Sequence, residues 1–310
     1  MKKLIILGLL ILGILSLGLF ASASEGVTEI ALIVKSVNSE FWQSMLNGGE
    51  QYDKENENVN VTPYGPESET DIEGAITILE NVVTSAPDAI VVASQSGEGA
   101  IPAVKDAMSQ GIPVITTDTI IPTEVISHLA TDNVAGGKTA ADAMVKALKE
   151  NGIEKSGTVI IMHVVVCDTD TQRGEGFDTR MTEIAPNIKI VHSRYTDDEV
   201  AQAMTATEDY ITTYDDLIGI FGIDYNIGEG IALAIEQAGL QDSVMVVAFD
   251  DSQAEIEALK KGVIKALIVQ DPYMMGYKGC EFAVRALKGE EIPKHVDTGV
   301  KVLKKEDVEK

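Results

Sequence analysis

The chain has 310 residues, of which 45% are hydrophobic, and 49 acidic against 24 basic residues give it a formal net charge of −25. This length exceeds the roughly 250 to 300 residues at which a single hydrophobic core stops growing, so two domains are expected. The negative charge repels phosphate backbones and anionic lipid surfaces, which disfavours nucleic-acid binding.

The first segment, residues 1–23, is predicted to be a cleaved signal peptide. Lys2 and Lys3 precede a long apolar run, and small residues follow at 21–23, as at a signal-peptide cleavage site. A retained membrane anchor is the alternative, because the apolar run is nearly long enough to span a bilayer. No cysteine stands at the exit of the run, so we expect no lipid attachment and a periplasmic location.

From residue 28 onward, short β-branched runs alternate with amphipathic stretches of helical length. The runs are continuously apolar, which is typical of parallel strands covered by helices on both faces. They lie at residues 30–34, 89–93, 113–117, 158–162, 217–221 and 244–248. The sequence therefore predicts an α/β protein with two Rossmann-like, doubly wound parallel sheets.

Polar and aromatic residues follow many of these runs. In open α/β sheets, ligands bind beyond the carboxyl ends of the strands, so these residues are candidates for a binding site. They are Lys35, Ser39, Phe41, Trp42, Asp118, Asp224, Asp250 and Gln270.

No metal site, cofactor or disulfide is predicted. The four histidines are far apart in sequence and lack metal-ligand spacing, and the acidic run 197–199 is interpreted as a solvated face. Gly136 and Gly137 resemble the end of a phosphate-binding loop without its first glycine, which favours helix packing instead. Cys167 and Cys280 lie in segments assigned to different lobes, so both are expected to be free thiols.

These strand ends, in this order, resemble the ribose and allose group of periplasmic sugar-binding proteins, from about residue 30 to residue 302. The matching stretches are residues 30–35 with Phe41 and Trp42, 112–118, 127–134 with Gly136 and Gly137, 173–177, 246–250 and 269–272. The resemblance implies two Rossmann-like lobes joined by three crossover strands. The N-terminal lobe would comprise residues 24–131 plus 271–299, and the C-terminal lobe residues 132–270 plus 300–310.

The resemblance also implies a hinge and a set of ligand contacts. Closure would occur near residues 131–133, 270–272 and 299–301. The implied ligand-binding residues are Lys35, Ser39, Phe41, Trp42, Asp118, Arg173, Asp224, Asp250 and Gln270.

Three positions depart from the ribose pattern, so ribose itself is not implied. Ser39 and Asp224 each stand where asparagine is usual, and Thr119 stands where an arginine would follow the aspartate.

These residue types suit a sugar, which has apolar ring faces and a polar rim. Phe41 and Trp42 can stack on a ring, the aspartates can accept from neighbouring hydroxyls, and Lys35 can donate to them. Tyr195 is a further candidate for stacking. The excess of acid leaves an amino sugar or another cation-bearing ligand open.

The function implied by the resemblance is capture of a small carbohydrate, a pentose or hexose, and its delivery to the permease of an ABC transporter. The alternative is a receptor that presents its ligand to a chemoreceptor, and the chain also resembles receptors for the furanosyl signal autoinducer-2. A sugar-responsive repressor would need a helix-turn-helix, which residues 1–27 lack. Glycoside hydrolysis could use two of the carboxylates, but they serve equally well as hydroxyl acceptors, and no enzyme is expected.

Overall fold

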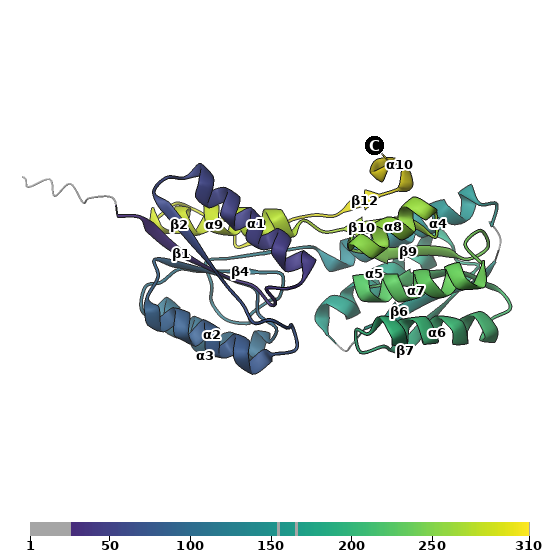
Figure 1. Cartoon of the computed structure of the whole chain (residues 1–310), viewed down its shortest axis with the longest axis horizontal. Coiled ribbons are helices and arrows are strands. Elements are labelled where there is room, and N and C mark those ends of the chain that lie inside the picture. Colours follow the sequence, from purple (N-terminus) through teal and green to yellow (C-terminus); the bar gives the residue numbers. More distant parts are fainter. Residues whose placement is uncertain (1–25, 154–155, 165–166, 310) are drawn as a thin grey trace, which may run out of the picture.

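Two open sheets, each with helices on both faces, make up the computed structural model, which describes residues 26–153, 156–164 and 167–309 (Figure 1). The α/β prediction with two doubly wound sheets is therefore confirmed. The predicted signal peptide at residues 1–23 lies outside the described residues.

The first sheet has the strand order β11-β5-β4-β3-β1-β2, with all of its pairs parallel. Its strands are β1 (Thr28–Ile33), β2 (Val59–Tyr64), β3 (Ala89–Val92), β4 (Val114–Thr117), β5 (Ser127–Ala130) and β11 (His295–Asp297). Its helices are α1 (Glu40–Glu55), α2 (Ile72–Ser85), α3 (Gly97–Ser109) and α9 (Pro272–Leu287).

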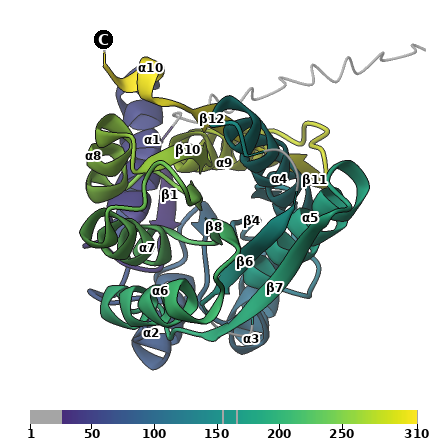
Figure 2. The same cartoon turned by 90° about the vertical axis from the view of Figure 1, so that its right-hand side faces the viewer.

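The second sheet repeats this order as β12-β10-β9-β8-β6-β7, except that β12 runs antiparallel to β10. Its strands are β6 (Gly157–His163), β7 (Ile188–Tyr195), β8 (Leu217–Gly222), β9 (Met245–Phe249), β10 (Ile264–Val269) and β12 (Lys301–Leu303). The remaining helices are α4 (Asn133–Glu150), α5 (Asp168–Ile184), α6 (Val200–Thr213), α7 (Tyr225–Ala238), α8 (Gln253–Lys261) and α10 (Lys305–Val308). Figure 2 shows this lobe end-on, with the helices arranged around its sheet.

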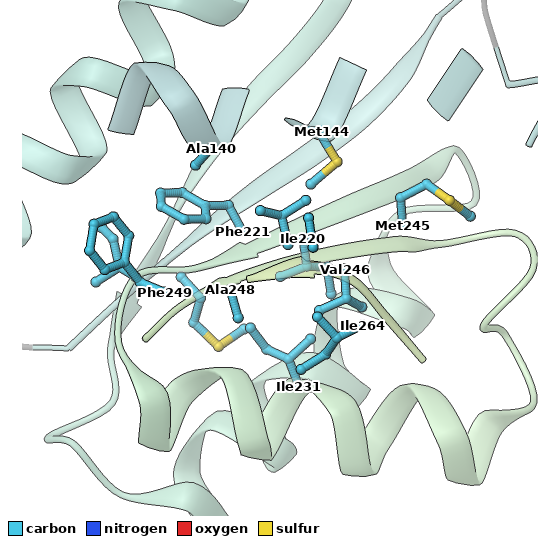
Figure 3. Packing of buried hydrophobic residues seen from close by; sticks show 14 of the residues in the cluster. Ala140, Met144, Ile220, Phe221, Ile231, Met245, Val246, Ala248, Phe249 and Ile264 are labelled. Carbon is cyan, nitrogen blue, oxygen red and sulfur yellow. The ribbon is translucent and has the colours of Figure 1, made fainter. Parts of the chain in front are cut away.

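The apolar strands are continuous because they supply a core on each face of the sheet. In β1, Ile30 and Leu32 pack beneath α1 and α9, whereas Ala31 and Ile33 pack against α2 and α3. The second sheet has an equivalent core in which Phe221 of β8 and Phe249 of β9 are fully buried (Figure 3). Burial of both faces fixes the strand ends, and thus the residues that follow them, at one edge of each sheet.

Glycines allow two helix pairs to approach closely. A Cβ at Gly48 of α1 would lie 2.0 Å from the Tyr273 carbonyl oxygen of α9. One at Gly137 of α4 would lie 2.1 Å from the Arg173 carbonyl oxygen of α5. The helix-packing interpretation of the glycine pair in α4 is confirmed, and this contact places Arg173 beside the first turn of α4.

Three segments connect the sheets, between β5 and α4, between β10 and α9, and between β11 and β12. Two of them are tied together by Asp297, whose Oδ1 accepts hydrogen bonds from the backbone N–H groups of Asp132 (3.0 Å) and Gly299 (2.7 Å). In the third, Asp271 caps α9 and its carboxylate lies 3.8 Å from the Lys301 ammonium.

Neither cysteine forms a disulfide: Cys167 is exposed and Cys280 is buried, so the prediction of free thiols is confirmed. Within the described ranges, no helix combines the length and apolar character needed to cross a membrane.

Candidate ligand-binding site

A cavity of about 620 Å³ lies between the two lobes, at the carboxyl ends of strands from both sheets. Its size falls within the range of small-molecule sites. Eight of the nine predicted ligand-binding residues line it, namely Lys35, Phe41, Trp42, Asp118, Arg173, Asp224, Asp250 and Gln270.

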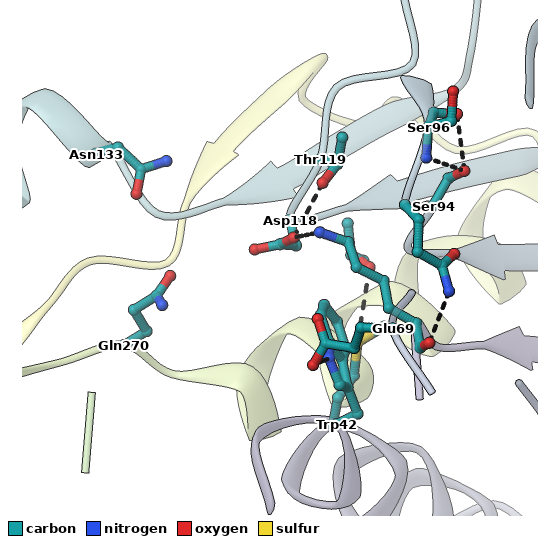
Figure 4. Close-up of polar contacts among 12 residues, drawn as sticks. Trp42, Glu69, Ser94, Ser96, Asp118, Thr119, Asn133 and Gln270 are labelled. Atoms are coloured by element: carbon teal, nitrogen blue, oxygen red, sulfur yellow. Dashed lines mark hydrogen bonds and ion pairs between the residues drawn. The ribbon is translucent and has the colours of Figure 1, made fainter. Parts of the chain in front are cut away.

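Lys35 and Asp118 form an ion pair on the N-terminal side of the cavity. The Lys35 Nζ donates to Asp118 Oδ2 at 2.6 Å, and the Thr119 hydroxyl donates to the same oxygen at 3.1 Å. Burial by itself would raise the pKa of Asp118, but the Lys35 ammonium holds this pKa below its ordinary value. Asn133 and Gln270 lie on the opposite side of Asp118 from this contact (Figure 4).

Phe41 and Trp42 form an aromatic wall at the start of α1. Their rings pack edge to face with centroids 4.7 Å apart, and the Lys35 Nζ lies 5.2 Å from the centroid of the Trp42 ring. Trp42 is only 3% exposed, and its Nε1 donates to Glu69 Oε1 at 2.7 Å. Trp42 is therefore held rigidly, with its indole N–H already engaged.

Arg173 of α5 is a buried donor fixed from three sides. Its Nη1 donates to the Ile223 carbonyl oxygen at 2.9 Å, and its Nε donates to Asn133 Oδ1 at 3.0 Å. The guanidinium carbon lies 3.8 Å from the centroid of the Phe249 ring, and Nη1 lies 4.0 Å from Asp250 Oδ2. The guanidinium therefore needs no reorganisation to bind a ligand oxygen.

Asp118 and Asp250 occupy equivalent places in the two sheets, directly after β4 and β9. Both have left-handed backbones, with φ of 60° and 75°, and each donates its backbone N–H to the neighbouring strand. The Gln270 Nε2 donates to Asp250 Oδ1 at 2.7 Å. Burial raises the pKa of Asp250, and Arg173 opposes this effect.

Asp224 caps α7, and Asn226 links its carboxyl group to that of Asp198. Asn226 contacts both groups: its backbone N–H donates to Asp224 Oδ1 and its Nδ2 to Asp198 Oδ1, each at 3.1 Å. Burial, with Asp198 and Asp250 nearby, raises the pKa of Asp224 well above its ordinary value.

Residues 197–199 are exposed, as expected for a solvated face, and Asp198 in addition lines the cavity. Asp197 and Asp198 both have left-handed backbones, with φ of 50° and 59°. This turn follows the end of β7 and brings Asp198 beside Asp224.

Ser39 and Tyr195 lie outside the cavity. Ser39 lines a neighbouring groove of about 1030 Å³, and Tyr225 lines both this groove and the cavity. Tyr195 is 49% exposed, and its ring lies 5.9 Å from that of His163.

Several cavity residues were not predicted from the sequence. Gln95 follows the apolar run of β3, so the rule of strand ends could have found it. Tyr225 follows β8 at the same distance and could have been found in the same way, whereas Glu69 comes from the loop after β2 and carries no such signal. With these additions, two cations and eight carboxyl groups line the cavity, the latter being those of Glu69, Glu98, Asp118, Asp168, Asp170, Asp198, Asp224 and Asp250.

A metal site is not formed by the residues that the structure describes, among which no three His, Cys, Asp or Glu side chains are arranged to hold an ion. The donors of the cavity are instead suited to an organic ligand with several hydroxyl groups, because carboxylates and a guanidinium converge beside aromatic rings.

Comparison with protein families matches residues 30–291 to a periplasmic binding protein domain. Among curated proteins, the chain is 28% identical over 278 residues to the ribose import binding protein of Escherichia coli, covering 89% of this chain and 90% of that protein. It is also 28% identical over 279 residues to the D-ribose/D-allose-binding protein of Pseudomonas aeruginosa, covering 87% and 85% of the two chains.

Solved structures show the same similarity over nearly the whole chain. A carbohydrate transporter solute binding protein from Agrobacterium radiobacter, in complex with D-arabinose, has a TM-score of 0.83 and 33% identity, with 91% of this chain and 96% of that chain covered. A periplasmic solute binding protein of an ABC transporter from Actinobacillus succinogenes, with bound D-allose, has a TM-score of 0.82 and 28% identity, with coverage of 90% and 98%.

Proposed function

Because the chain belongs to the periplasmic binding protein family, we propose that it captures a small sugar, a pentose or hexose, between its lobes and delivers it to the permease of an ABC transporter. The observation that carries this proposal is the interlobe cavity, where aromatic rings lie beside carboxylates and a fixed guanidinium. The relatives named above bind ribose, allose or arabinose.

Different residues of the cavity recognise different parts of the sugar. Asp118 and Asp250 accept hydrogen bonds from sugar hydroxyls, Arg173 donates to a ring or hydroxyl oxygen, and Phe41 covers an apolar face of the ring. Lys35 keeps Asp118 ionised. Because these groups are held by contacts within the protein, little side-chain freedom is lost on binding.

The lobes are proposed to comprise residues 24–131 with 271–299 and residues 132–270 with 300–310. The membership of β11 in the first sheet and β12 in the second supports the last boundary. Closure would then occur at the three connecting segments, and the ligand stabilises the closed form through contacts with both lobes.

Export through the signal peptide at residues 1–23 is part of the proposal and would place the protein in the periplasm. Ligand binding without chemical conversion follows from membership of this family, whose members are non-enzymatic. The carboxylates therefore act as hydrogen-bond acceptors.

Thermal melting against a ligand panel tests the proposal. The purified protein, refolded to remove bound ligand, is heated with pentoses, hexoses, polyols and autoinducer-2. A ligand at a hundredfold excess over its dissociation constant stabilises the fold by about 2.7 kcal/mol, which raises the midpoint. We expect a selective shift with one sugar. A shift with autoinducer-2 alone would favour the signal-receptor alternative, in which a chemoreceptor is the partner, and the absence of any shift would contradict sugar binding.

A further inference from the structure

The side chain of Arg173, the buried donor of the cavity, is held by the first turn of α4. Its Nε donates to Oδ1 of Asn133, the first residue of this helix, at 3.0 Å. Its Nη1 donates to the Ile223 carbonyl oxygen at 2.9 Å. Within the part of the chain that the structure describes, Nη2 has no hydrogen-bond partner. Nη2 therefore keeps both of its N–H groups for a ligand.

Phe249 contacts the same guanidinium through its ring, and the glycine at position 136 makes room for that ring. The guanidinium carbon lies 3.8 Å from the ring centroid. A Cβ at Gly136 would lie 2.8 Å from Phe249 Cζ, well inside the roughly 3.5 to 4.0 Å at which carbon atoms pack. Phe249 is fully buried, so a larger residue at position 136 displaces the ring that stacks on Arg173.

The first turn of α4 is itself located by the segments that connect the lobes. Asp132, which caps the helix, donates its backbone N–H to Asp297 Oδ1 at the end of β11, at 3.0 Å. A Cβ at Gly136 would also lie 3.7 Å from Val300, in the segment between β11 and β12. The direction of the guanidinium is therefore fixed by an element that begins at the hinge proposed for closure.

Resting on the proposed sugar-binding function, we propose that Asn133 and Gly136 are positioning residues for ligand binding. Neither lines the cavity, and both act through Arg173, whose Nη2 they direct towards the ligand. An amide oxygen suits this task, because it fixes the guanidinium without neutralising its charge, whereas a carboxylate forms an ion pair with it. The ligand then meets a charged donor that is already oriented.

The Nε–H signal of Arg173 in the nuclear magnetic resonance spectrum of the ¹⁵N-labelled, ligand-free protein tests the contact with Asn133. The signal is assigned by its absence in Arg173→Lys. A hydrogen-bonded Nε–H exchanges slowly with water, so Asn133→Ala should speed this exchange about tenfold, whereas Asn133→Asp, which retains an acceptor oxygen, should keep it slow. Asn151→Ala, at the opposite end of the same helix, is the matched control and should leave the exchange unchanged.

Isothermal titration measures the effect on binding, with D-ribose, D-arabinose, D-allose, D-glucose and D-galactose as ligands. For a sugar that the wild type binds, Asn133→Ala should raise the dissociation constant about three- to tenfold, because the hydrogen bond that orients the donor is lost. Asn133→Asp keeps the orientation but pairs with the charge, so its dissociation constant should lie between those of the wild type and Asn133→Ala. Asn151→Ala should bind as the wild type does.

Gly136→Ala separates positioning from a purely structural role. Alanine is a better helix former than glycine, so a residue that served only the helix would bind ligand unchanged after this substitution. The added methyl group displaces the Phe249 ring instead, and the dissociation constant should rise about three- to tenfold. Thermal melting of the ligand-free variant confirms that it is folded.

The outcomes separate the two proposals. Slow exchange of the Arg173 Nε–H in Asn133→Ala would overturn the role of Asn133. Dissociation constants equal to that of the wild type in both Asn133→Ala and Gly136→Ala would overturn the inference and leave the proposed function standing. Failure of the wild type to bind any of the five sugars would contradict the proposed function, and the exchange of the Nε–H would then decide the inference by itself.

Discussion

At the scale of single residues, two carboxylates of the cavity are each paired with a cation. Lys35 faces Asp118 at 2.6 Å, and Arg173 lies 4.0 Å from Asp250. A buried charge without its partner is costly, so removing one member of a pair affects ligand binding more than removing a charge on the exposed surface.

Replacement of Asp118 by asparagine is expected to weaken ligand binding by about 1.5 to 3 kcal/mol, the range for hydrogen bonds to charged groups. The fold should persist, because asparagine tolerates the left-handed backbone at φ 60°. Isothermal titration measures the affinity, and Asp106→Asn on the exposed surface of α3 is the control. Wild-type affinity in Asp118→Asn would remove this carboxylate from the site.

At the scale of elements, the start of α8 contains a buried ionisable group. Ser252 and Glu255 form a capping box, in which each side chain accepts a hydrogen bond from the backbone N–H of the other. Glu255 is fully buried, and burial together with Asp250 raises its pKa well above the ordinary value. At a pH between the ordinary pKa and this raised pKa, the folded state therefore retains a proton on Glu255 that the unfolded state releases.

This difference predicts a pH dependence of stability. Above the ordinary glutamate pKa of 4.5, the folded state binds more protons than the unfolded state, so the free energy of unfolding falls as the pH rises towards the folded-state value. Glu255→Gln should reduce the downward slope by at most about 1.4 kcal/mol per pH unit, the value for one proton.

Urea unfolding of the ligand-free protein between pH 5 and 8 measures this slope. Glu257→Gln, on the exposed face of the same helix, is the matched control and should keep the wild-type slope. Identical slopes for Glu255→Gln and the wild type would show that Glu255 is ionised in the folded state.

The individual strands also show how much of the fold the sequence can predict. The buried strands β1, β3, β4, β6, β8 and β9 were predicted because their runs are apolar on both faces. The edge strand β2 was missed, since it is only partly buried and contains Pro63. The strands β11 and β12 have three residues each and carry no pattern of their own.

The residues of the binding site show the same difference between buried strands and edge strands. Five predicted residues follow buried strands, whose ends fix their location in a parallel sheet: Lys35, Asp118, Asp224, Asp250 and Gln270. Glu69 and Asp198 follow the edge strands β2 and β7, and their meeting depends on how two lobes face each other. Local sequence patterns contain no information on that arrangement, so the meeting of Glu69 and Asp198 becomes visible only in three dimensions.

At the scale of the whole molecule, one contact joins the lobes outside the cavity. The Glu40 Oε2 of α1 accepts a hydrogen bond from the backbone N–H of Gln253, the first residue of α8, at 3.2 Å. A carboxylate at a helix N-terminus contributes about 0.3 to 1 kcal/mol. This contact exists only when the lobes are close, so it favours the closed form.

Glu40→Ala is expected to raise the dissociation constant of the ligand roughly two- to fivefold, because the closed form loses this contact while the cavity keeps its own residues. Titration gives the affinity, and small-angle scattering with and without ligand reports the separation of the lobes. Glu80→Ala, an exposed acid on α2, is the control. Unchanged or tighter binding in Glu40→Ala would show that the contact does not contribute to closure.

The left-handed backbone at Asp118 and Asp250 also has a consequence for how this pocket can change during evolution. Few side chains other than those of asparagine, aspartate and glycine occupy such a backbone without strain, so substitution at both positions is narrowly restricted. New ligand preferences must then arise at neighbouring positions with ordinary backbones, and Asp224, with φ of −150°, is one of them. Divergence within such a lineage should therefore concentrate at such positions while the two strand-end aspartates stay constant.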